Sequence, residues 1–117
     1  MLQQSKHYHM HIRVPELGLE IYPGQKNFRA DKMIEEYATS SWAFIVGTAL
    51  LSIEHLPVKK AEMISNNSYL PSLQGWFIIG IQKQDAATIA AQQGLNTFIY
   101  GEKNQMPQII LLAGKDL

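Results

Sequence analysis

Residues 76–112 constrain the fold most, because strand and helix patterns alternate there with clear boundaries. Residues 76–81 are a dense apolar run of aromatic and β-branched side chains, a composition typical of a strand buried on both faces. Asp85 suits a helix start, where its carboxylate can accept hydrogen bonds from free N–H groups. Gly94 suits the helix end, where a left-handed residue is needed. The pattern predicts a helix over residues 86–93 with a small-residue face that packs closely on a sheet.

The remainder of this region predicts two further strands. Residues 95–100, which end in Phe98, Ile99 and Tyr100, predict a strand, and residues 101–106 form a polar turn that ends at Pro107. Residues 108–113 are again apolar and predict the last strand. Because a short polar turn separates the two runs, we expect them to pair as a hairpin.

The N-terminal region shows a strict alternation of side chains over residues 7–14. This period of two is typical of a strand, with Met10, Ile12 and Val14 on one face and three histidines on the other. The turn that follows begins with Pro15, and residues 17–22 alternate again. We therefore predict a second hairpin at this end of the chain.

The middle of the chain is harder to assign. Residues 31–38 have apolar side chains at helical spacing and predict a helix. Residues 42–53 are apolar without alternation, so their first part predicts a central strand, although periodicity alone leaves a buried helix open. Residues 57–64 predict a short helix that begins at a proline. Proline has no backbone N–H, and the first N–H groups of a helix have no partner within the helix, so nothing is lost there.

These segments predict one α+β domain over residues 1–117, with no linker long enough to divide it. Its expected core is a single mixed or mostly antiparallel sheet of about five or six strands, with about two or three short helices packed on one face. An apolar fraction of 46% is sufficient for a buried core of this kind.

The charge balance bears on the partners. The chain has 10 Lys+Arg and 10 Asp+Glu, so its formal net charge is zero. Nucleic acid is not an expected partner, because phosphate binding needs a basic excess or a basic patch. A neutral chain also offers little repulsion between copies, which is compatible with a homodimer.

The sequence also bears on the compartment and the membrane. Cysteine is absent, which excludes disulfides, thiolate metal ligands and cysteine nucleophiles and fits a cytoplasmic location. Residues 1–6 contain no apolar signal core. The longest apolar run, residues 42–51, is about half the length of a membrane-spanning helix, so we expect no membrane partner.

Three histidines at alternating positions are the only candidate metal site. His7, His9 and His11 share one strand face, where neighbours lie about 7 Å apart. Imidazoles at this separation can bind one zinc, copper, nickel or iron ion. We assign His9 and His11, with His7 as a third candidate, as metal ligands, and expect no other cofactor. The alternative is a solvent-facing histidine stripe on a terminal edge strand, where polar side chains discourage unwanted pairing.

No catalytic residue is predicted. The chain has no Gly-x-Ser-x-Gly nucleophile elbow, no Gly-x-Gly-x-x-Gly segment and no P-loop. Glu35 and Glu36 are adjacent on a predicted helix, so their carboxylates do not face each other. Trp42 and Trp76 lie in apolar runs, which favours packing in the core over stacking on a ligand.

Part of the chain resembles a known family. The strand at residues 42–46, the strand at residues 74–79 and above all residues 90–100 are similar to segments of a small bacterial family described only as a domain of unknown function. Over residues 42–112 this resemblance implies a fold shared with that family more than a shared activity. Members of that family have Thr-Ala-x-Asn-Pro and Gln-Asn-Ala segments. This chain lacks the Asn-Pro after Thr48 and Ala49, and it keeps only Asn96 of the Gln-Asn-Ala segment. The resemblance therefore implies that any site those polar residues form is not kept in this chain.

Together these observations favour a small non-enzymatic, regulatory domain that binds another protein through a sheet edge or an apolar patch. The alternative is a metal-binding protein or a metal-dependent enzyme that uses the His7, His9 and His11 face. A third hypothesis is a small-ligand carrier with a pocket between the helices and the sheet, since concave apolar sites need no sequence motif.

Overall fold

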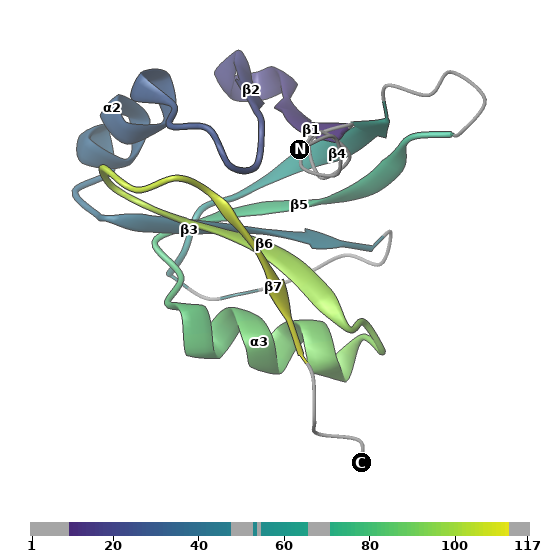
Figure 1. Cartoon of the computed structure of the whole chain (residues 1–117). Coiled ribbons are helices and arrows are strands. Elements are labelled where there is room, and N and C mark those ends of the chain that lie inside the picture. The colour runs from purple at the N-terminus through teal and green to yellow at the C-terminus, as the bar shows by residue number, and fades with distance from the viewer. Residues whose placement is uncertain (1–9, 48–52, 54, 66–70, 113–117) are drawn as a thin grey trace.

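A computed structural model describes residues 10–47, 53, 55–65 and 71–112 (Figure 1). One antiparallel sheet dominates the structure, and one helix precedes its third strand while another precedes its sixth. In chain order the elements are β1 (Met10–Val14), the 3-10 helix η1 (Pro15–Leu17), β2 (Leu19–Ile21), α2 (Phe28–Glu36), β3 (Ser41–Val46), β4 (Val58–Ser65), β5 (Leu73–Ile79), α3 (Lys83–Gln92), β6 (Thr97–Glu102) and β7 (Gln108–Leu111).

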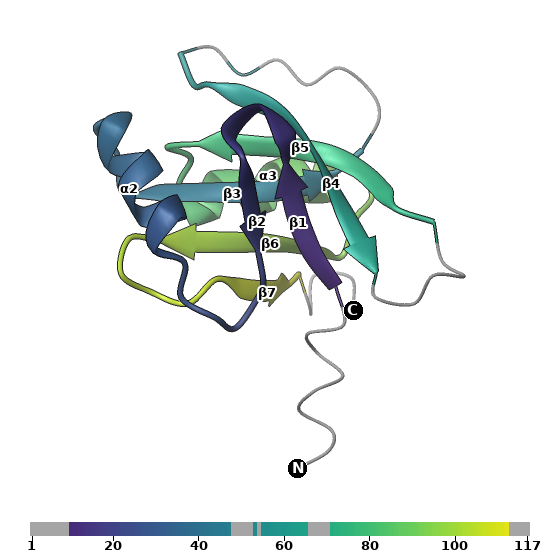
Figure 2. The same ribbon diagram turned by 90° about the horizontal axis from the view of Figure 1, so that it is seen from above.

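The seven strands follow the order β2-β1-β4-β5-β3-β6-β7, and every neighbouring pair is antiparallel. The sheet is strongly curled, so that β1 and β2 cross over β3 and β6 (Figure 2). This curl brings the two edge strands, β2 and β7, toward each other. The segments beside these strands are joined, because the N–H of Gly24, after β2, donates a hydrogen bond of 2.8 Å to the carbonyl of Pro107, just before β7. The sheet is therefore an incomplete barrel.

The central strands are buried on both faces because each contributes to two separate apolar clusters. In β3, Trp42 and Phe44 belong to the cluster inside the curl, whereas Ala43 and Ile45 belong to the cluster on the outer face. The alternation of side chains along a strand divides β5 and β6 between the two clusters in the same way. Burial on both faces explains why these strands appear in the sequence as continuous apolar runs.

The helices lie on opposite faces of the sheet (Figure 1). The helix α3 packs Ala86 and Ala90 into the outer cluster, and these small side chains allow it to lie close to the sheet. The helix α2 packs Met33 and Ile34 into the inner cluster, beside the curled β1–β2 hairpin. No helix in the described part of the chain is long and apolar enough to cross a membrane.

Several predicted elements are confirmed. Both hairpins form, β1 with β2 and β6 with β7. The first part of residues 42–53 is the central strand β3, not a buried helix. The predicted helix over residues 86–93 is present as α3, which begins three residues earlier, and Gly94 follows it with φ of 77°.

The predicted fold class is wrong in two respects. The sheet has seven strands instead of five or six, and its two α-helices cover opposite faces instead of one. Residues 57–64 were expected to form a helix, yet residues 58–64 lie in β4, which pairs with both β1 and β5. The helical spacing of apolar side chains in that segment is outweighed by the two rows of backbone hydrogen bonds that it makes as a strand.

Candidate functional site

The open edge of β7 is the first candidate site. The Leu112 N–H donates to the Asn96 carbonyl at 2.9 Å, and Ile110 lies opposite Phe98 in the β6–β7 register. Backbone groups in an antiparallel pair alternate between facing the neighbouring strand and facing away from it. Ile110 therefore faces β6, whereas the N–H and C=O groups of Ile109 and Leu111 point away. Within the described chain no hydrogen bond reaches those outward groups.

The side chains of the same two residues are apolar and exposed. Ile109 is 40% exposed and Leu111 is 68% exposed. Because Ile109 lies opposite Ile99, which belongs to the inner cluster, both side chains lie on the concave face of the sheet. No charged residue occurs between positions 104 and 114 of the sequence. The edge thus offers free backbone groups beside an uncharged apolar row.

The opposite edge, β2, is closed by the chain itself. It has three residues, and the carbonyl of the middle one, Glu20, accepts a hydrogen bond of 2.9 Å from Asn27 Nδ2. The Glu20 carboxylate also lies 3.4 Å from Arg13 Nε. A short, charged and capped edge strand resists pairing with another chain. The two edges of this sheet therefore differ sharply in their capacity to accept a new strand.

The Gly24–Pro107 hydrogen bond marks where the open part of β7 begins. Pro107 is two residues before Ile109, so its carbonyl also points away from β6, and that carbonyl is already paired with Gly24. The next outward residues along the strand, Ile109 and Leu111, lie beyond this contact. The curled sheet is closed at the start of β7 and open along the rest of the strand.

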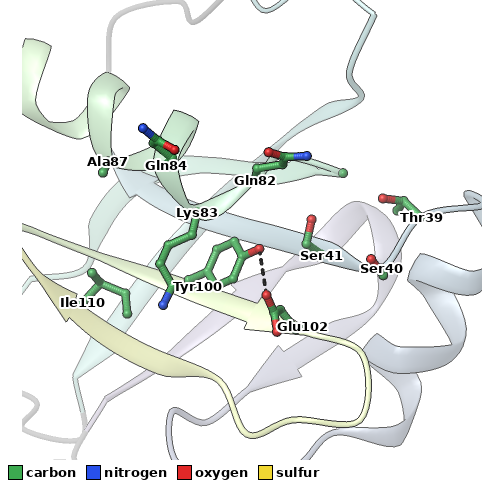
Figure 3. Close-up of a pocket in the computed structure, with 11 residues that line it drawn as sticks. Thr39, Ser40, Ser41, Gln82, Lys83, Gln84, Ala87, Tyr100, Glu102 and Ile110 are labelled. Carbon is green, nitrogen blue, oxygen red and sulfur yellow. Dashed lines mark hydrogen bonds between the residues drawn. The ribbon is translucent and has the colours of Figure 1, made fainter.

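A polar cleft borders the outer face of β7 and is the second candidate site (Figure 3). It has a volume of about 600 Å³ and lies between the first turn of α3, the ends of β3 and β6, and β7. Most of its lining side chains carry hydroxyl, amide or charged groups. They are Thr39, Ser40, Ser41, Gln82, Lys83, Gln84, Tyr100 and Glu102, with Ala87 and Ile110 completing the wall beside Gly80.

Tyr100 lies at the centre of this cleft and is held as a neutral phenol. Its hydroxyl lies 3.3 Å from a carboxylate oxygen of Glu102 (Figure 3). Burial raises the pKa of Tyr100 above its ordinary value of 10.0, and hydrogen bonding with Ser41 and with the Lys83 backbone N–H only partly offsets this effect. A phenol with a raised pKa is a poor base or nucleophile at neutral pH, so the residue suits hydrogen bonding better than catalysis.

Lys83 and Ser41 complete the polar groups of the cleft. The Lys83 ammonium lies 5.8 Å from the centre of the Tyr100 ring, within range of a cation–π contact, and it makes no ion pair with any described carboxylate. The Ser41 hydroxyl donates a hydrogen bond of 2.7 Å to the Ile81 carbonyl. No histidine lines the described cleft, so Ser41 has no imidazole beside it to act as a base.

The predicted metal ligands are only partly within the described structure. His7 and His9 lie outside the described residues, and the metal site remains a prediction for them. His11 is described and is 8% exposed, so it is not part of a solvent-facing stripe. The expectation of a terminal edge strand is also wrong, because β1 lies between β2 and β4.

His11 is instead packed among its neighbours. Its ring stacks on Tyr22 with 4.7 Å between centroids. Its Nε2 atom lies 3.4 Å from Glu20 Oε1, and neither ring nitrogen makes a hydrogen bond in the described chain. Among the described residues, no three His, Cys, Asp or Glu side chains gather where they could hold a metal ion.

No protein family, curated protein or solved structure matches this chain. The candidate sites therefore depend on the geometry alone. The sequence did contain one signal for the β7 edge, the uncharged stretch from position 104 to position 114. It contained none for the cleft, because Ser41, Lys83 and Tyr100 are distant in sequence and only the fold brings them together.

Proposed function

We propose that this chain is a protein-interaction domain that binds an extended segment of a partner protein along the edge of β7. The observation that supports the proposal most directly is the coincidence of free backbone groups and exposed apolar side chains at Ile109 and Leu111. Addition of a strand to an exposed sheet edge is a common mode of peptide recognition. The backbone bonds supply affinity, and alternate side chains supply specificity.

The expected affinity is modest, because the open edge is short. Two outward residues supply one donor and one acceptor each, and such hydrogen bonds contribute about 0.5–1.5 kcal/mol net apiece. Burial of the Ile109 and Leu111 side chains adds about 25 cal/mol for each Å² of apolar surface. Since ordering the peptide opposes both contributions, we expect binding in the micromolar range instead of the nanomolar range.

The partner segment should alternate in character. Its side chains on the concave face meet Ile109 and Leu111, so apolar residues fit there. Its side chains on the outer face lie beside Ile110 and the polar cleft, where polar residues fit. Period-two alternation is therefore the expected signature of a bound segment.

Selection from a random peptide library displayed on phage tests the proposal. The wild-type protein is the bait, and the variant Ile109→Lys/Leu111→Lys is the counter-selection, because it places charges on the edge without removing its backbone groups. We expect selected peptides to alternate as described and to bind the variant at least about tenfold more weakly, the effect of losing about 1.4 kcal/mol. Synthetic copies with N-methylated amides should lose binding as well, since the added strand then lacks its donors.

A matched control variant, Phe28→Lys, alters another exposed apolar side chain that does not belong to β7, since Phe28 is 83% exposed at the start of α2. This variant should bind the selected peptides as the wild type does. The proposal fails if no peptide is enriched. It also fails if enriched peptides bind the edge variant and the wild type equally.

A further inference from the structure

We infer that one partner of the β7 edge is a second copy of this chain, paired antiparallel about a two-fold axis that passes beside Ile110. This inference rests on the proposed function, because it uses the same open edge, and it adds the identity and the register of a partner. The outward-facing residues Ile109 and Leu111 flank Ile110 symmetrically along the strand. That spacing is the feature from which the register follows.

The register can be derived from strand geometry. With the axis at Ile110, Ile109 of one copy faces Leu111 of the other copy, and the reverse pair is equivalent. Each of these is a hydrogen-bonded pair, in which the two residues exchange both N–H and C=O bonds. All outward groups of Ile109 and Leu111 are then satisfied. An axis at Ile109 places Leu111 opposite Pro107, whose carbonyl is already paired with Gly24, and an axis at Leu111 places Ile109 opposite position 113, outside the described residues.

The side chains are also self-complementary in this arrangement. The Ile109 and Leu111 side chains of both copies meet on one face and bury apolar surface against apolar surface. The stretch between positions 104 and 114 has no charge, and the chain has a formal net charge of zero, so no charge on β7 opposes a second copy. A two-fold interface uses the same surface on both subunits, which this edge can provide.

The contact is limited in length. Toward the start of β7 the Pro107 carbonyl is occupied by the Gly24 N–H, so pairing stops before that residue. An interface of this size lies below the range of about 1,200–2,000 Å² that stable complexes bury. We therefore expect a reversible dimer that forms with rising concentration.

Sedimentation analysis of the intact chain tests self-association. The weight-average mass should rise from 13.2 kDa toward twice that value between low micromolar and millimolar protein. The Ile109→Lys/Leu111→Lys variant should remain at the monomer mass over the same range, and Phe28→Lys should follow the wild type. A wild type that remains a monomer throughout would overturn the inference.

Cysteine cross-linking tests the register, and the absence of native cysteine allows it without any background. In an antiparallel pair that is not hydrogen-bonded, facing Cα atoms lie about 4.5 Å apart, which permits a disulfide. Ile110→Cys should therefore form a covalent dimer under mild oxidation. Gln108→Cys, on the same strand and face, should not, because its symmetry mate lies about 13 Å away along the strand.

A mixing experiment retains Ile110 in case its replacement disturbs the outer cluster. The single variants Ile109→Cys and Leu111→Cys should each fail to cross-link alone, because like positions lie two residues out of register. An equimolar mixture should cross-link, since Ile109 of one copy faces Leu111 of the other at about 5.5 Å. Equal cross-linking of the separate variants and the mixture would overturn the register.

These measurements separate the two proposals. If the protein is monomeric and uncross-linked while library peptides bind the β7 edge, the second-copy inference fails and the proposed function stands. If peptides and second copies both fail to bind, the proposed function fails as well. Dimerisation that survives Ile109→Lys/Leu111→Lys would assign self-association to another surface and contradict the inference.

Discussion

At the scale of single residues, Gly101 in β6 is fixed by the indole of Trp42. A Cβ atom at position 101 would lie 2.2 Å from Trp42 Cε2, far inside normal contact. Trp42 is buried in the inner cluster and also lies 5.0 Å from the Phe77 ring between centroids, so it has little room to move. A side chain at position 101 therefore competes with the largest residue of the core.

We predict that Gly101→Ala lowers the free energy of unfolding by about 1–3 kcal/mol, the usual cost of overpacking a core. Urea denaturation followed by circular dichroism measures this change. Gly47→Ala is the matched control, because its added Cβ would meet only the end of the flexible Gln93 side chain. A Gly101→Ala loss no larger than that of the control would show that Trp42 can move aside.

Tyr100 predicts a dependence of stability on alkaline pH. Burial raises the pKa of its hydroxyl in the folded protein above the ordinary value of 10.0, so folding favours the neutral phenol. The resulting stabilisation is complete below the unfolded pKa and is lost as the pH rises through the folded pKa. Between about pH 9 and pH 12, wild-type stability should therefore decline more steeply than that of Tyr100→Phe, measured by urea denaturation. Parallel declines in the two proteins would contradict this prediction.

At the scale of elements, the two long helices begin differently. Asn27 caps α2, because its Oδ1 accepts a hydrogen bond of 2.8 Å from the Ala30 N–H while its Nδ2 bonds the Glu20 carbonyl. Gln82 precedes α3 and its side chain makes no capping hydrogen bond. The start of α2 is therefore stabilised by its cap, whereas the start of α3 lacks a side-chain cap that a substitution could supply.

We predict opposite effects of substitutions at these two positions. Asn27→Ala should lower the free energy of unfolding by about 1–2 kcal/mol, because it removes both the cap and the bond that closes β2. Gln82→Ser should raise it by about 0.5–1 kcal/mol, since a serine there can accept from the first turn of α3. Thermal denaturation of both variants beside the wild type measures the pair. A loss of stability in Gln82→Ser would show that the Gln82 side chain has another structural role.

The elements also show how far the sequence determines this fold. Strands buried on both faces, such as β3 and β5, are predictable because dense apolar runs have few alternatives. The strand β4 is not, because its apolar residues Val58, Ala61 and Ile64 recur at helical spacing, and the choice of strand depends on partners distant in sequence. Helix or strand propensity depends on residues that are close in sequence, whereas the pairing of β4 with β1 and β5 depends on residues that are distant in sequence.

The candidate site was less predictable than the fold. The β6–β7 hairpin follows from the sequence, but which strand of it remains at an open edge depends on the order of all seven strands. The same order places β1 inside the sheet and buries His11, which the alternation had placed on a histidine face, either as a metal ligand or in a solvent-facing stripe. Loop connections between strands do not fix that order, so neither outcome could be derived from local pattern.

At the scale of the whole molecule, two apolar clusters share the same central strands. Trp42 belongs to the inner cluster and Trp76 to the outer cluster, and the chain has no other tryptophan. Because β3 and β5 each supply side chains to both clusters, loss of one face removes support from the other. The molecule should therefore unfold as one cooperative unit.

Single-tryptophan variants test this cooperativity. Trp76→Phe reports the inner cluster through Trp42, and Trp42→Phe reports the outer cluster through Trp76. In each variant we expect the fluorescence transition to coincide with the circular dichroism transition during urea denaturation. A fluorescence midpoint that precedes the circular dichroism midpoint in either variant would show that the corresponding face melts first.

The unequal edges of the sheet have a consequence for assembly in crowded solution. Growth of a fibre needs a donor edge and an acceptor edge on every subunit, so that each addition leaves a fresh end. Here Asn27 already binds the Glu20 carbonyl of the three-residue β2, so among the described strands β7 is the edge that remains open. A second copy that pairs through its own β7 then presents only its β2 edge to further copies, and that edge does not accept a strand. Polymerisation through the sheet therefore ends at the dimer.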